Sequence, residues 1–252
     1  MGRVFKIVTS SAWLLLWVVL AVQSANAQKR YPSIDDAWDG TDYRALIQRV
    51  QKDGLELPTL SDATTKPVFD RMVNVDNIPL RMGLNKELSV GIRFQKLDSA
   101  LDPIHKLVIL YSDETQKGKP YTAEIARLMV YESRVSGALL NLSEPLLSSL
   151  AKDARYQARV AELDKMKGSA RQLYSDLVQR MAETKLYSKP DTIKMIRGAL
   201  AELPAYHPIF TNENRLDLVQ RLTQQISTTT DQELKTALTE LRDAIKERRI
   251  PT

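Results

Sequence analysis

Apolar side chains recur every three or four residues along most of the chain, and this spacing places them on one face of an α-helix. The clearest run covers residues 85–111, where the steps alternate between four and three. Its apolar positions are Val90, Phe94, Leu97, Leu101, Ile104, Val108 and Tyr111. Asn85 can cap the start of this helix by accepting from free backbone N–H groups. Pro103 lies inside the helix and lacks a backbone N–H, so we expect a kink there.

Two further segments, 120–150 and 153–186, show the same rhythm. The apolar positions are Ile125, Leu128, Val135, Leu139, Leu142, Leu146 and Leu150 in the first, and Tyr156, Val160, Leu163, Ala170, Tyr174, Leu177 and Met181 in the second. Gly137 and Ala138 are small enough to let a neighbouring helix approach closely. The connection at 112–119 is short and polar, which predicts that the helices it joins pack side by side and antiparallel.

Shorter helices follow the long segments. Ser188 is placed to cap the first of them, Asn212 the second, and the capping box that begins at Thr230 the third. The proline-flanked stretch 204–208 predicts a rigid loop between the first two. These signals indicate three short helices at the C-terminal end of the chain.

The N-terminal part is less regular. A helix fits 41–52, a shorter one fits 65–73, and residues 74–84 have the proline and glycine content of a loop. We find no alternating pattern long enough for a convincing strand. The sequence therefore predicts an all-α protein, an antiparallel multi-helix bundle of three long helices with shorter packed helices at both ends.

The same pattern divides the chain into regions. Residues 28–84 form an irregular N-terminal region, 85–187 the long-helix bundle, and 188–252 a C-terminal three-helix segment. The last two segments are expected to form one compact domain, since about 225 residues suit a single helical core.

The first 27 residues have the pattern of a secretory signal peptide. Arg3 and Lys6 precede an apolar run at 12–22, and the run ends in a small–x–small exit that predicts cleavage between Ala27 and Gln28. The apolar run is shorter than the roughly 20 residues needed to span a bilayer. We therefore expect a bacterial Sec-type export signal and a periplasmic or secreted protein without a stable membrane span, although retention by an uncleaved signal stays open.

Composition narrows the classes of function. The chain has no cysteine, which excludes disulfides, thiolate metal sites and c-type haem attachment. Subtracting Arg3 and Lys6 from 36 basic residues leaves 34 against 31 acidic ones, a formal charge of +3. That balance is too even to indicate nucleic-acid binding. Walker and Rossmann glycine motifs are absent, so nucleotide enzymes are disfavoured.

Glu132 is the one candidate for catalysis, because it occupies a slot in its helix where an apolar residue is due. The run 125–134 (IARLMVYESR) resembles the helix that carries the catalytic glutamate of lytic transglycosylases, where Glu-Ser follows an apolar stretch. The resemblance implies a carboxylic acid of raised pKa that protonates a glycosidic oxygen. The Gly-Leu-Met-Gln segment of that family is missing at 135–140. The alternative is a structural glutamate paired with Arg127, Arg134 or an arginine of another helix.

A second enzyme motif is weaker. Ser149 and Lys152 match the Ser-x-x-Lys spacing of penicillin-binding enzymes, and Lys235-Thr-Ala237 faintly resembles their Lys-Thr-Gly. Those enzymes need a strand beside a large sheet. This chain offers no predicted sheet, so we attribute the match to chance.

Two sets of residues, an acidic cluster and the two histidines, contain possible metal ligands, and each also has a simpler structural interpretation. Four acidic residues cluster near a glycine, and these weak candidates for a cation are Asp35, Asp36, Asp39 and Asp42. Their spacing fails the EF-hand pattern, and acidic residues before a helix are expected to cap it. His105 or His207 could bind a non-covalent haem with a methionine opposite, but a hydrogen-bonded histidine at the core boundary is the simpler reading of His105. We predict neither a metal nor a cofactor.

These observations favour an exported helical interaction or adaptor protein without intrinsic catalysis. The expected partner is another protein of the cell envelope, with self-association possible and no role for nucleic acid. A cell-wall glycan enzyme that uses Glu132 as general acid is the first alternative. A small-ligand or haem carrier is the second.

Overall fold

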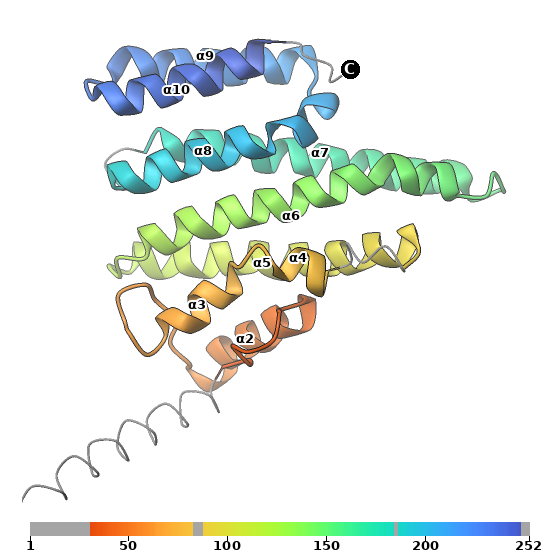
Figure 1. Cartoon of the computed structure of the whole chain (residues 1–252), viewed down its shortest axis with the longest axis horizontal. Coiled ribbons are helices and arrows are strands. Elements are labelled where there is room, and N and C mark those ends of the chain that lie inside the picture. The colour runs from red at the N-terminus through yellow and green to blue at the C-terminus, as the bar shows by residue number, and fades with distance from the viewer. Residues whose placement is uncertain (1–30, 83–87, 184–185, 248–252) are drawn as a thin grey trace, which may run out of the picture.

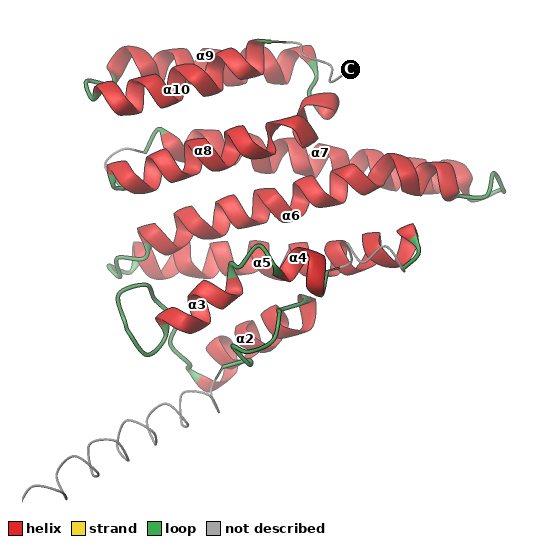
Figure 2. Ribbon diagram, in the orientation of Figure 1, coloured by secondary structure: helices red, strands yellow, loops and turns green. Residues whose placement is uncertain are grey.

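The computed structural model describes residues 31–82, 88–183 and 186–247. Within these ranges the chain is helical and has no strand, which confirms the all-α prediction (Figure 2). The segment expected to be a signal peptide lies outside the described residues, as does Asn85. The cap of the first long helix is instead Ser89, whose side chain accepts from the backbone N–H of Ile92.

The N-terminal region contains three helices: α2 (Gly40–Asp53), α3 (Lys66–Met72) and α4 (Asn77–Leu80). The prediction of a loop at 74–84 was wrong at Asn77–Leu80, which form α4. The turn is held by tertiary contacts, because the buried Asn77 side chain accepts from the backbone N–H of Trp38 and donates to the carbonyl of Arg71. Local propensity did not indicate this bond.

The three long helices are α5 (Val90–Gln116), α6 (Thr122–Ser149) and α7 (Tyr156–Met181). All three predicted long segments are present. α5 continues through Pro103, which leaves the carbonyl of Ser99 without its usual partner within the helix. Arg44 of α2 donates to that carbonyl at 2.9 Å.

The C-terminal part contains α8 (Lys189–Tyr206), the 3-10 turn η1 (His207–Ile209), α9 (Asn212–Thr228) and α10 (Gln232–Lys246). The predicted loop at 204–208 was wrong, because α8 runs through Pro204 to Tyr206. Burial of the Tyr206 ring and its hydroxyl bond to the Ser133 carbonyl, at 2.9 Å, hold this last turn in place. The observed caps of α9 and α10 are Thr211 and Asp231, each one residue from the prediction.

The helices follow one another across the molecule as stacked hairpins. Figure 1 shows α2, α5, α6, α8 and the α9–α10 pair in succession from one end to the other. α6 is the central element and packs against α5, α7 and α8, while α10 packs against α8 and α9. Helix pairs stacked in this way form continuous surfaces along both sides of the stack.

Two glycines set the distance between α6 and α8. A Cβ atom on Gly137 of α6 would lie 2.9 Å from the Glu202 carboxylate of α8, which confirms the predicted close approach. A Cβ atom on Gly198 of α8 would lie 2.5 Å from a methyl group of Val130. The contact at Gly198 requires glycine, because Val130 is branched next to its backbone, whereas the carboxylate of Glu202 lies at the end of a flexible side chain.

We predict that Gly198→Ala destabilises the protein by about 1–3 kcal/mol, because the added methyl group overpacks the α6–α8 contact at Val130. The measurement is urea unfolding followed by circular dichroism. Gly91→Ala is the matched control, since its Cβ atom would meet nothing within 4 Å and should stabilise the helix by about 0.4–1 kcal/mol. Equal free energies of unfolding for the two variants would contradict the proposed close contact.

Candidate functional site

A groove of about 470 Å³ lies between α5 and α7, with buried side chains of α6 at its base. α5 and α7 form its walls, and Met129 and Glu132 of α6 lie between them. The wall residues are His105, Val108, Ile109, Ser112, Asp113 and Gln116 of α5, and Leu173, Asp176, Gln179, Arg180 and Glu183 of α7 and the turn after it. We call this the α5–α7 groove.

Glu132 contacts His105 in this groove. The distance from His105 Nδ1 to Glu132 Oε1 is 2.7 Å, so a protonated Nδ1 donates to the carboxylate. The side chain of Glu132 is 4% exposed and that of His105 is 55% exposed. The pair thus joins a buried carboxylate of α6 to a solvent-exposed imidazole of α5.

Burial raises the pKa of Glu132, and the contact with Glu132 raises the pKa of His105. Burial raises the pKa of Glu132, since a carboxylate loses its hydration there, and the hydrogen bond from His105 opposes that rise. The hydrogen bond to Glu132 is the largest cause that raises the pKa of His105, and the charges of Glu132, Asp102 and Asp176 add to it. The pair can therefore hold a proton near neutral pH and exchange it with solvent through His105.

The arginine pairing considered for Glu132 was wrong, since its partner is a histidine. Arg127 instead pairs with Asp70, at 3.3 Å, and Arg134 pairs with Glu202, at 2.8 Å. The prediction that His105 is a hydrogen-bonded boundary residue agrees with the observed contact. The lining of the groove contains no Tyr, Trp or Phe, so the aromatic platforms that commonly hold sugar rings are missing from it.

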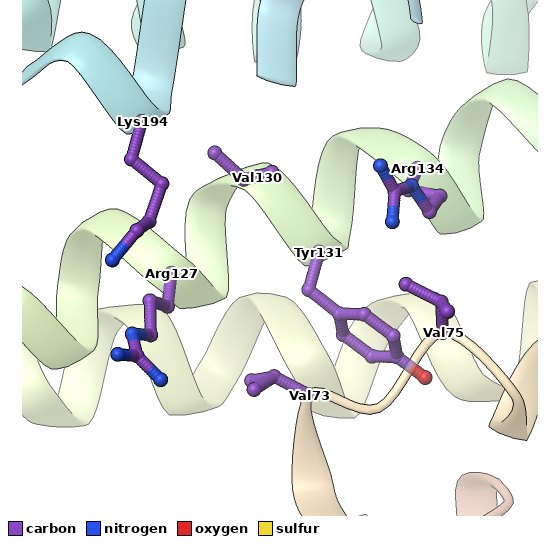
Figure 3. Close-up of a pocket in the computed structure, with 7 residues that line it drawn as sticks. All are labelled: Val73, Val75, Arg127, Val130, Tyr131, Arg134 and Lys194. Carbon is purple, nitrogen blue, oxygen red and sulfur yellow. The ribbon is translucent and has the colours of Figure 1, made fainter. Parts of the chain in front are cut away.

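A second pocket, of about 370 Å³, has a basic and apolar lining, and we call it the basic pocket (Figure 3). Its residues are Val73 and Val75 after α3, Arg127, Val130, Tyr131 and Arg134 of α6, and Lys194 of α8. Sequence reasoning missed this site. The one available signal was the seven-residue spacing of the two arginines, which places both on one side of α6.

Two of the four candidate aspartates, Asp39 and Asp42, cap the start of α2. Asp39 is the N-cap and accepts from the Thr41 N–H, while Asp42 accepts from the Asp39 N–H at 3.0 Å. Asp35 and Asp36 precede this capping box. No group of three or more metal-ligating side chains occurs among the residues that the structure describes, and these four do not form one. The structure thus favours the capping interpretation over a cation site.

The remaining sequence candidates make local contacts of their own. Ser149 lies at the end of α6 and donates to the Leu146 carbonyl, with Lys152 exposed beyond it. His207 lies in η1 against Phe210, whereas His105 lies on α5 in the groove. The two histidines belong to different elements, and His105 contacts Glu132 through Nδ1.

We predict that the titration midpoint of His105 lies above 6.5, and that Glu132→Gln lowers it, because the carboxylate stabilises the imidazolium. The measurement is an NMR titration of the two histidine rings, assigned with His207→Gln. A midpoint that does not move in Glu132→Gln would contradict the contact.

The raised pKa values of Glu132 and His105 also determine how the free energy of unfolding changes with pH. Both pKa values are raised in the folded chain, so the folded state binds more protons than the unfolded state from the ordinary carboxyl value of 4.5 upward. The stabilisation is fully present below the unfolded values. It is lost as the pH rises through the folded ones. Relative to Glu132→Gln, the wild-type chain should therefore lose unfolding free energy as the pH rises above 4.5, and a parallel pH dependence would speak against this assignment.

Comparison with known protein families, with curated proteins and with solved structures finds no significant match for this chain. A fold also does not determine a function, since one architecture hosts many activities. We therefore base the functional proposal on the α5–α7 groove and the basic pocket themselves.

Proposed function

We propose that the protein is an exported helical interaction protein without intrinsic catalysis, and that the α5–α7 groove binds a basic, amphipathic helical segment of another cell-envelope protein. The observation that carries this proposal is the groove itself, an open channel between two helices with apolar and acidic walls. A helix laid between two helices is a common mode of peptide recognition.

The charges of the groove favour a basic partner. Four of its side chains are acidic, and two, His105 and Arg180, are basic; the acidic residues are Asp113, Glu132, Asp176 and Glu183. Arg180 is already paired with Glu183 at 3.2 Å. Asp113 and Asp176 lie on opposite walls, and neither forms an ion pair within the described part of the chain. Asp176 accepts from the Gln172 amide at 2.8 Å, and its charge stays available to a cationic ligand. Complementary charges of this kind steer association and discriminate between partners.

The apolar part of the groove supports an amphipathic partner. Val108 and Ile109 of α5 face Leu173 of α7 across the groove, with Met129 at the base. Ile109 is 45% exposed, so an apolar face of a partner would cover it on binding. Burial of such side chains contributes about 25 cal/mol per Å² of apolar surface.

Export belongs to the proposal and rests on the N-terminal sequence pattern. No helix in the described part of the chain combines the length and the apolar character needed to cross a bilayer. N-terminal sequencing of the protein recovered from a bacterial periplasm should begin at Gln28, whereas recovery of the intact leader in the cytosol would remove this part of the proposal.

We predict that a synthetic helical peptide with leucine on one face and lysine on the other binds the protein saturably. The double variant Asp113→Lys/Asp176→Lys should weaken binding by about tenfold or more, equivalent to about 1.4 kcal/mol, because like charges then meet across the interface. The measurement is fluorescence anisotropy of the labelled peptide at low ionic strength.

The matched control is Glu162→Lys/Asp164→Lys, which makes the same change of charge at exposed positions nearer the start of α7. This control should bind the lysine peptide almost as tightly as the wild type, and a peptide with glutamate in place of lysine should not bind. Equal binding of the two peptides, or equal loss in both double variants, would show that the groove does not select a basic helix.

Acid catalysis on cell-wall glycan is the second candidate, and the observation in its favour is Glu132 itself, a carboxyl of raised pKa that borders an open groove. Under the main proposal, wild type and Glu132→Gln both leave peptidoglycan turbidity unchanged, with a lytic glycosidase as positive control. Clearing by the wild type that falls about 100-fold or more in Glu132→Gln would instead establish the enzyme, since that is the usual contribution of a general acid.

A further inference from the structure

The basic pocket lies on the opposite side of α6 from the α5–α7 groove. At 100° per residue, Val130, Tyr131 and the two arginines of the pocket share one side of the helix, and Met129 and Glu132 share the other. A ligand in the basic pocket would therefore not contact the groove. The basic pocket can therefore bind a ligand independently of the α5–α7 groove.

Three cationic side chains converge on this pocket. Arg127 and Arg134 lie about two turns apart on α6, and Figure 3 shows Lys194 extending from α8 toward Arg127. Arg127 pairs with Asp70 and Arg134 with Glu202. Within the part of the chain that the structure describes, no acidic side chain forms an ion pair with Lys194. Because Asp70 also pairs with Lys66, the two carboxylates do not balance the cations, and positive charge is left over at the pocket.

Arg127 has hydrogen-bonding capacity to spare. Its Nε atom is buried and has no hydrogen-bond partner among the described residues. Its contact with Asp70 is a single one, at 3.3 Å, and Asp70 is shared with Lys66. A guanidinium group carries five N–H donors and favours oxyanions that accept two of them. Arg127 can therefore donate further hydrogen bonds to an oxyanion that binds in the pocket.

The rest of the pocket is apolar. Val73, Val75, Val130 and the ring of Tyr131 form its wall, and Val75 is 45% exposed. The hydroxyl of Tyr131 is occupied by the Tyr43 hydroxyl, at 3.0 Å. Because Tyr43 donates its proton to the Met72 carbonyl, Tyr131 is the donor in this contact. A ligand thus meets charge at one side and hydrocarbon at the other.

We propose that the basic pocket binds a monocarboxylate whose charged group is attached to a small apolar chain or ring. The carboxylate lies between Lys194 and Arg127, and the apolar part packs on the three valines. A carboxylate supplies the ion-pair partner that Lys194 lacks among the described residues, and the hydrocarbon attached to it matches the three valines. A free carboxylic acid and the C-terminal residue of an apolar peptide present the same chemistry.

The test is a methyl NMR titration of the full chain with hexanoate. Saturable shifts are expected at Val73, Val75 and Val130, with no effect from hexanamide, which lacks the charge. Lys194→Gln should weaken hexanoate binding about tenfold, since it removes a charge-assisted hydrogen bond. Lys165→Gln, an equal change of charge at an exposed position of α7, should leave the affinity unchanged.

A second variant tests the apolar half without touching the charges. Val75→Ser at this half-exposed position should weaken binding of hexanoate but not the much weaker binding of acetate. An acetylated tripeptide that ends in leucine is compared with hexanoate. Tighter binding of the tripeptide indicates a peptide C-terminus as the ligand, and tighter binding of hexanoate indicates a free carboxylic acid. The proposal is overturned if hexanoate gives no saturable shifts at the valines, if hexanamide binds equally well, or if Lys194→Gln binds like the wild type.

Discussion

The close contact between α6 and α8 is the constraint on which the rest of the structure depends. Gly137 and Gly198 remove two side chains from this interface, so that Val130 and Glu202 can lie against the opposite backbone. α8 in turn packs against α10, and α6 packs against α5 and α7. Because interiors are packed at crystal-like density, a wider spacing here would shift every layer of the stack.

Buried polar groups fix the irregular N-terminal region to this stack. Glu124 of α6 accepts from the Leu60 N–H at 2.7 Å, and Tyr111 of α5 donates to the Pro58 carbonyl at 2.6 Å. Tyr43 of α2 donates to the Met72 carbonyl beside Tyr131. A chain without cysteine therefore holds its loops by satisfied hydrogen bonds within the core, where an unmade bond costs about 1–3 kcal/mol.

α6 also links the two candidate sites, because it contributes to both from opposite sides. Glu132 lies at the base of an acidic groove, and Arg127 and Arg134 line a basic pocket. A helix that is buried on most of its surface has few positions for charged residues. Those that it has are all paired or border a pocket, which is why the charged residues of α6 are informative about function.

The sequence by itself determined the helical class, the three long helices and the close approach at Gly137, since each depends on periodicity or size within one segment. It also singled out Glu132 as an exception to an apolar stripe. The partner of Glu132, 27 residues away on α5, and the basic pocket, assembled from Val73 to Lys194, were decided by the tertiary structure alone. The physical reason is that a heptad pattern tells which side of a helix is buried, whereas the axial register and neighbour of that helix are set by side-chain packing between segments distant in the chain.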